Sequence, residues 1–210
     1  TAERRCPFAA SWGSWGGLLW FSLFEEAVAV LIAFMAYLRP GELFSLTPES
    51  LAPPVSGTGG SAHWGLILGA SELGKPNKTG EFDESVLLDW QGFGWLGTYL
   101  DILHARPRGL PLWTFDAVHL TSGMHGAALV SGVYVLQPQL YSLRHGGASF
   151  DAISKRRPLP EIKKRGRWRT DTSVRRYEKA ALALREATRL SDETAAFAKV
   201  VEASLAEFLL

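Results

Sequence analysis

The stretch LFEEAVAVLIAFMAYL, residues 23–38, decides how this chain folds. Its apolar residues cover most of a helical surface, which is typical of a central helix that other elements surround. Glu25 and Glu26 interrupt the apolar run, and the uncharged part from Ala27 to Leu38 has only twelve residues. That length is too short to cross a bilayer. We therefore predict a buried core helix and no membrane partner.

Around this helix, the sequence predicts a mainly α-helical domain with one small antiparallel β-hairpin, an α+β fold. Pro40 suits the first turn of a short helix and Glu42 suits its positive end, which places Arg39 at the helix start. Val, Leu and Ile in runs 63–70 and 85–89, separated by a Gly/Pro/Asn-rich turn, indicate the hairpin. Further helices are expected at 92–105, at 112–136 with an interruption around 123–126, after 140, near 161–167, and from 174 to about 190.

The charge of the chain is concentrated in one segment. From Tyr141 to Arg189 there are fourteen Lys/Arg against five Asp/Glu, whereas the remainder carries eight against sixteen. Concentrated positive charge is typical of a protein that binds a polyanion, because neutralised phosphates release counterions. A solvated basic helix face is the alternative. The single cysteine, Cys6, excludes an intrachain disulfide and favours an intracellular protein.

Four short motifs occur in order along the chain. The first is AYLRPGELFSL (36–46), with an arginine three residues before a glutamate. KTG (78–80) lies on the predicted hairpin turn, and YSLRHGGAS (141–149) follows. The last combines GRW (166–168) with TSVRRYEKA (172–180), which puts Trp168 nine residues before Tyr177. Each motif alone is weak evidence of function. A lone tyrosine on a basic helix, for example, is usually a packing residue. The occurrence of all four motifs in this order is a specific signal.

Together these motifs resemble the catalytic domain of the tyrosine recombinases, the phage-integrase family. The resemblance implies that Tyr177 attacks a DNA phosphodiester to form a 3′-phosphotyrosyl intermediate. It also implies that Arg39 and Arg144 clamp the phosphate oxygens and that Lys78 is the general acid, with Lys75 as the alternative. Trp168 would pack against the site. No metal or other cofactor is implied, and the histidines show no metal-ligand spacing.

One position departs from the family pattern. Tyr141 stands where the family has the histidine of His-x-x-Arg, and a phenol is a poor proton shuttle near neutrality. His145, directly after Arg144, is then the candidate that accepts the proton of Tyr177. Eight basic residues are expected to contact DNA without reading its sequence: Lys75, Lys163, Lys164, Arg165, Arg167, Arg169, Arg175 and Arg176.

The resemblance also sets expectations for organisation and partners. Residues 1–19 would be a linker or the remnant of an N-terminal DNA-clamping domain, 20–190 the catalytic domain, and 191–210 an amphipathic helix. That helix carries Phe197, Val201, Leu205 and Phe208 on one face, and it either packs on its own domain or docks on a neighbouring protomer. The expected partners are duplex DNA and copies of this chain in a synaptic tetramer, in a nucleus, cytoplasm or nucleoid.

Two other functions remain open at this stage. One is a decayed or domesticated integrase domain that acts only as a DNA- or protein-binding module. The other is a type IB topoisomerase, which shares the chemistry but relaxes supercoils as a monomer.

Overall fold

The computed structural model describes residues 15–56, 61–69, 84–90, 94–175, 177 and 180–209. This part is mainly helical with one small antiparallel sheet, which confirms the predicted α+β class. Its α-helices are α1 (Trp15–Met35), α2 (Pro40–Phe44), α3 (Leu96–His104), α4 (Ala117–Val130), α5 (Leu140–Ile153), α6 (Leu159–Arg165), α7 (Asp171–Arg175), α8 (Ala180–Ala187) and α9 (Asp192–Leu209). Its strands are β1 (Leu51–Ala52), β2 (Gly65–Leu68) and β3 (Glu84–Leu87), and its 3₁₀ turns are η1 (Pro48–Ser50) and η3 (Tyr134–Leu136).

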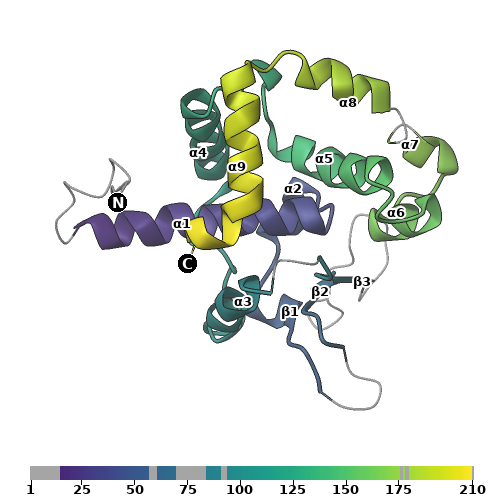
Figure 1. Cartoon of the computed structure of the whole chain (residues 1–210). Coiled ribbons are helices and arrows are strands. Elements are labelled where there is room, and N and C mark those ends of the chain that lie inside the picture. Colours follow the sequence, from purple (N-terminus) through teal and green to yellow (C-terminus); the bar gives the residue numbers. More distant parts are fainter. Residues whose placement is uncertain are drawn as a thin grey trace.

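The central helix predicted from residues 23–38 is confirmed. α1 runs through the middle of the molecule, with α3 and the sheet on one side and α4, α5 and α9 on the other (Figure 1). Val28, Ala29 and Ile32 are fully buried in the core. Within the described residues, no helix has both the length and the hydropathy needed to span a membrane.

The predicted hairpin is present as β2 and β3, which pair antiparallel with Leu66 opposite Val86. A third strand, β1, pairs on the other side of β2 and was not expected, because two residues carry too little alternation to indicate a strand. Lys75 and Lys78, on the predicted turn of the hairpin, lie outside the described residues.

Two expectations about helix breaks are wrong. α4 runs unbroken through Gly123, where a side chain would lie 2.5 Å from the Glu26 carboxylate, so this glycine permits close packing and does not interrupt the helix. Conversely, the helix expected from 174 to 190 is divided: α7 ends at Arg175 and α8 begins at Ala180. Tyr177 lies between them and is buried.

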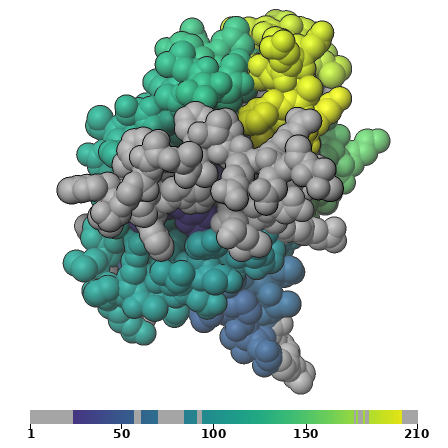
Figure 2. Space-filling view, turned by 60° about the vertical axis from the view of Figure 1, so that its left-hand side comes forward, coloured from purple at the N-terminus to yellow at the C-terminus, as the bar shows by residue number. Residues whose placement is uncertain are grey.

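The C-terminal helix predicted for 191–210 is present as α9. Ser191 Oγ accepts the backbone N–H of Thr194 at 3.2 Å and so caps the start of α9. Figure 2 shows the yellow surface of α9 beside that of α4, and Thr194 contacts the chain at Gly132, just after α4 ends. Farther along α9, Phe197 and Val200 are exposed.

Gly147 sets the distance between α1 and α5. A Cβ atom there would lie 2.0 Å from the carbonyl oxygen of Phe34, so the two helices can approach this closely only at a glycine. We expect Gly147→Ala to lower the free energy of unfolding by about 1–3 kcal/mol, because the backbones must separate.

Urea denaturation followed by circular dichroism tests this expectation. Gly126→Ala is the matched control, since Gly126 lies within α4 with nothing within 4 Å of the added Cβ atom. It should stabilise the protein by about 0.5–1 kcal/mol through helix propensity. Equal effects of the two substitutions would contradict the proposed close approach.

Candidate active site

Tyr177 and His145 meet in a contact between distant parts of the chain. The hydroxyl oxygen of Tyr177 lies 2.6 Å from Nδ1 of His145, a hydrogen-bond distance. His145 is on the second turn of α5, beside Arg144 in sequence. Since imidazole exchanges protons readily near neutral pH, this contact gives Tyr177 an adjacent group that can take its proton.

Trp168 lies between Tyr177 and Arg144. Its ring centroid is 4.9 Å from that of Tyr177 and 4.5 Å from Cζ of Arg144, within reach of a cation–π interaction. α6 ends at Arg165, and the chain then turns through Arg167, which has a left-handed φ of 55°. The indole ring lies against Gly166, where a Cβ atom would be 1.7 Å from it. This turn therefore fixes the indole in the site.

Arg144 is fully buried. Its guanidinium donates to the backbone carbonyls of Tyr37 and Gly166 and lies 4.0 Å from the Glu42 carboxylate. Its Nε has no hydrogen-bond partner among the described residues. Burial lowers the pKa of Arg144 to about 10, and the charges of Arg39 and Arg167 act in the same direction. The side chain therefore still carries its charge at pH 7.

The Glu42 carboxylate pairs with the other arginines of the site. It accepts from the side chain and the backbone N–H of Arg39, the latter at 2.8 Å, and from Arg167 at 2.6 Å. Although burial acts to raise the pKa of Glu42, the positive charges of Arg167 and Arg39 hold it below its usual value. One carboxylate thus faces three guanidinium groups, and Glu84 adds a second carboxylate 3.7 Å from Arg167, so positive charge is still in excess among these groups.

Tyr141 lies on the other side of His145. The two ring centroids are 4.8 Å apart, and the tyrosine is 45% exposed, whereas Tyr177 is 3% exposed. The structure therefore brings together six of the seven catalytic candidates, namely Arg39, Tyr141, Arg144, His145, Trp168 and Tyr177. The seventh, Lys78, lies outside the described residues.

The basic residues expected to contact DNA fall into two groups. Lys164, Arg169 and Arg175 are exposed, and we call these three the basic face; Lys163 is partly exposed and donates to Asp171 at 2.6 Å. Arg176 lies outside the described residues.

The second group does not reach the surface. Arg165 is buried and donates to the carbonyls of Met35 and Leu87. Arg167 is also buried and donates to the Glu42 carboxylate. As placed here, neither side chain can contact a phosphate on the surface. Their role in this structure is to join α6 and the turn that follows it to the end of α1 and the sheet.

A buried network beneath the site was not anticipated from the sequence. The hydroxyl of Tyr37 donates to Asp151, which also accepts from Nε of Arg157 at 2.9 Å. Arg157 then donates to Asp89 at 2.6 Å, beyond the end of β3. Tyr37 has a left-handed φ of 51°, and this conformation ends α1. No local sequence pattern indicates this network, because Tyr37 and Asp151, and likewise Arg157 and Asp89, are far apart in the chain.

The described residues contain no cluster of three or more His, Cys, Asp or Glu side chains that could hold a metal ion. Comparison of the chain with protein-family models, curated proteins and solved structures finds no match. The assignment of function therefore rests on the order of the motifs and on the geometry of Tyr177, His145, Trp168 and Arg144.

Glu42→Gln should change how stability depends on pH. Because the folded protein lowers the pKa of Glu42, this residue contributes stability above the unfolded pKa and loses it as the pH falls through the folded pKa. At pH 7 we expect the variant to be less stable by about 3 kcal/mol, since buried arginines lose their counter-charge.

Thermal or urea unfolding between about pH 3 and pH 7 measures this difference. The two stability curves should converge toward the acidic end. Glu193→Gln, at an exposed position in the first turn of α9, should follow the wild-type curve. Curves of Glu42→Gln and wild type that stay parallel over the whole range would contradict the role given to Glu42.

Proposed function

We propose that this chain is a DNA strand-exchange enzyme of the tyrosine-recombinase type. The observation that carries the proposal is the 2.6 Å contact between the Tyr177 hydroxyl and Nδ1 of His145. A nucleophilic hydroxyl needs an adjacent base, and a histidine held at hydrogen-bond distance is the usual solution. The contact joins the two residues that the sequence motifs had suggested as nucleophile and proton acceptor.

In the proposed reaction, the Tyr177 oxygen bonds to phosphorus as the bond to the 5′ oxygen breaks. The phenolic proton passes to His145, and Lys78 donates a proton to the leaving oxygen. Arg144 and Arg39 hold the non-bridging oxygens while negative charge develops on them. The phosphotyrosyl bond conserves the energy of the broken bond, so a 5′-hydroxyl can reverse the reaction without a nucleotide cofactor.

The burial of the site imposes a condition on this reaction. Arg144 is fully buried and Tyr177 is 3% exposed, so a phosphate reaches them only after the site opens. Phosphate oxygens would then replace the carbonyls of Tyr37 and Gly166 as acceptors. Charged acceptors bind guanidinium more strongly than neutral ones do, which makes this exchange favourable.

The same burial favours a second candidate function, a module that binds DNA without cutting it. In that case Arg144 would hold α5 against α1 and α6, and Tyr177 would be a core residue beside Val174 and Ile162. The basic face would still contact phosphates. The two candidates differ in whether a covalent adduct forms.

The expected oligomer draws support from α9. Phe197, on the apolar stripe of this helix, is 53% exposed, and Val200, beside that stripe, is 56% exposed, although an apolar helix face usually packs in a core. A neighbouring protomer in a synaptic tetramer on duplex DNA would cover them.

Incubation with a nicked suicide DNA substrate, followed by denaturing electrophoresis, tests the enzyme. Wild-type protein should form a covalent adduct and Tyr177→Phe should form none, because phenylalanine has no oxygen to attack phosphorus. Tyr134→Phe is the control: Tyr134 is exposed on η3, and its loss should leave adduct formation unchanged. DNA binding without a covalent adduct on any substrate would instead support the second candidate function, a module that binds DNA without cutting it.

The basic face predicts a specific salt dependence of duplex binding. Arg175→Ala should weaken affinity on all sequences alike and reduce the slope of log K against log salt by about 1, because one phosphate contact is lost. Arg108→Ala removes an arginine that is also exposed but lies outside the basic segment, and it should leave the slope unchanged. An unchanged slope for Arg175→Ala, or equal changes for both variants, would remove Arg175 from the DNA interface.

A further inference from the structure

Helix α5 holds Tyr37 at two points. Arg144 donates to the backbone carbonyl of Tyr37, and Asp151, two helical turns farther along α5, accepts a hydrogen bond from the hydroxyl of the same tyrosine. Residues at this spacing share one face of a helix, so both contacts reach the turn at the end of α1. The first contact belongs to the candidate active site, whereas the second has no part in the proposed chemistry.

The backbone of Tyr37 is in an unfavourable conformation. Its φ of 51° is left-handed, a region that residues with a side chain seldom occupy. Such a conformation persists only where surrounding contacts hold it. The polar contacts that do so are the bond from the hydroxyl to Asp151 and the bonds that Arg144 and Arg167 donate to the carbonyl, the last at 3.2 Å. Loss of these contacts therefore favours a different conformation of the turn.

Asp151 is a fixed acceptor. It is fully buried, and its Oδ2 also accepts from Nε of Arg157 at 2.9 Å. Arg157 in turn donates to Asp89 at 2.6 Å and to Glu161. Burial and the Asp151 carboxylate raise the pKa of the Tyr37 hydroxyl above its usual value, so the hydroxyl keeps its proton and remains a donor. A hydrogen bond to a charged group is stronger than one between neutral groups.

A phosphate can compete for only one of the two contacts. Its oxygens can replace the Tyr37 carbonyl as acceptors for Arg144. They cannot replace the Tyr37 hydroxyl on Asp151, because a phosphodiester has no donor to offer and its charge has the same sign as that of the carboxylate. The bond between Tyr37 and Asp151 therefore opposes opening of the site even when DNA is bound.

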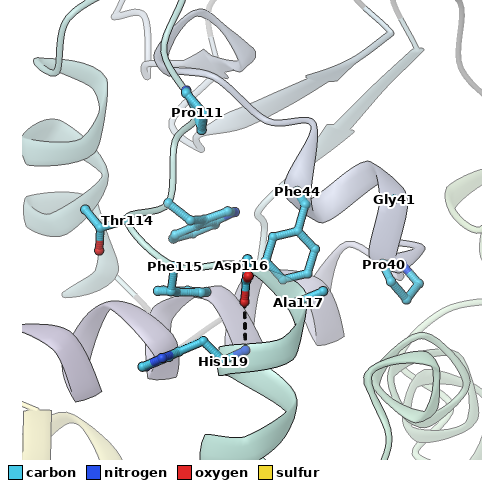
Figure 3. A pocket seen from close by; sticks show the side chains of 10 residues that line it. Pro40, Gly41, Phe44, Pro111, Thr114, Phe115, Asp116, Ala117 and His119 are labelled. Atoms are coloured by element: carbon cyan, nitrogen blue, oxygen red, sulfur yellow. Dashed lines mark hydrogen bonds between the residues drawn. The ribbon is translucent and has the colours of Figure 1, made fainter.

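The chain just beyond this turn borders open space. Pro40 and Gly41, the first residues of α2, line a groove of about 870 Å³ between α2 and the chain leading into α4 (Figure 3). A Cβ atom added to Gly41 would meet nothing within 4 Å. The start of α2 is therefore unpacked on this side, which leaves room for the turn to move.

We propose that the hydrogen bond between the Tyr37 hydroxyl and Asp151 is a latch that holds the candidate site closed. Tyr37 and Tyr177 both pack on Trp168, with ring centroids 6.2 Å and 4.9 Å from that of the indole. Displacement of Tyr37 thus loosens the packing that buries Tyr177. The latch is a property of the protein alone, whereas its effect on DNA cleavage rests on the proposed function.

Nitration by tetranitromethane, which modifies accessible tyrosine rings, tests the latch without DNA. Peptide mass spectrometry measures the nitration rate at each tyrosine. Tyr37→Phe keeps the ring and removes only the hydroxyl. It should raise the nitration rate at Tyr177 about tenfold, because one hydrogen bond to a charged group no longer opposes opening. The rate at Tyr134, which is 44% exposed, should not change.

Two further variants complete the experiment, and circular dichroism verifies the folding of each. Ile32→Val is the matched control, since it leaves a small cavity in the buried part of α1 and lowers stability without touching the latch. Its nitration rate at Tyr177 should equal that of wild type. Asp151→Asn keeps an acceptor for the Tyr37 hydroxyl but removes the charge, so the rate at Tyr177 should rise by a smaller factor than in Tyr37→Phe.

The latch is overturned if Tyr37→Phe nitrates at Tyr177 no faster than wild type, or if Ile32→Val raises this rate as much. On a nicked suicide DNA substrate, Tyr37→Phe should form the covalent adduct faster than wild type. Slower formation would also overturn the latch, because the hydroxyl would then assist the reaction. Absence of an adduct in every protein would instead overturn the proposed function and leave the nitration result unchanged.

Discussion

The buried guanidinium of Arg144 is the interaction on which the candidate site depends. From α5 it reaches the carbonyl of Tyr37, where α1 ends, and the carbonyl of Gly166, where α6 ends. Removing a charge from water is costly unless such acceptors replace the lost hydration. Because both carbonyls belong to turns, Arg144 fixes the position of Trp168, and Trp168 in turn packs on Tyr177.

In the proposed reaction, the same interaction would also control the access of a phosphate to the site. Each acceptor that now satisfies Arg144 is an uncharged carbonyl, and the Glu42 carboxylate, 4.0 Å away, also pairs with Arg39 and Arg167. An arriving phosphate would therefore find a cationic site whose charge is only partly balanced. Opening of the turns around Tyr37 and Gly166 would couple phosphate binding to exposure of Tyr177. In the proposed reaction, such coupling would restrict cleavage to DNA that is already bound.

Hydropathy was sufficient to predict the central helix over residues 23–38, because a run that is apolar on all sides has to be buried. The spacing of the motifs likewise selected Tyr177 and its neighbours. The spacing could not predict that Arg165 and Arg167 are buried, because both looked like surface charges in a basic run. Their partners, Leu87 and Glu42, lie far away in the chain, so only tertiary packing reveals that these arginines are internal.

Peptide mapping by mass spectrometry of the covalent protein–DNA adduct tests the central claim most directly, because it identifies both the amino acid and the DNA end that are joined. The account predicts a 3′-phosphate on the peptide that contains Tyr177. An adduct on Tyr141, the exposed phenol on the other side of His145, or a link to a 5′-phosphate would contradict it.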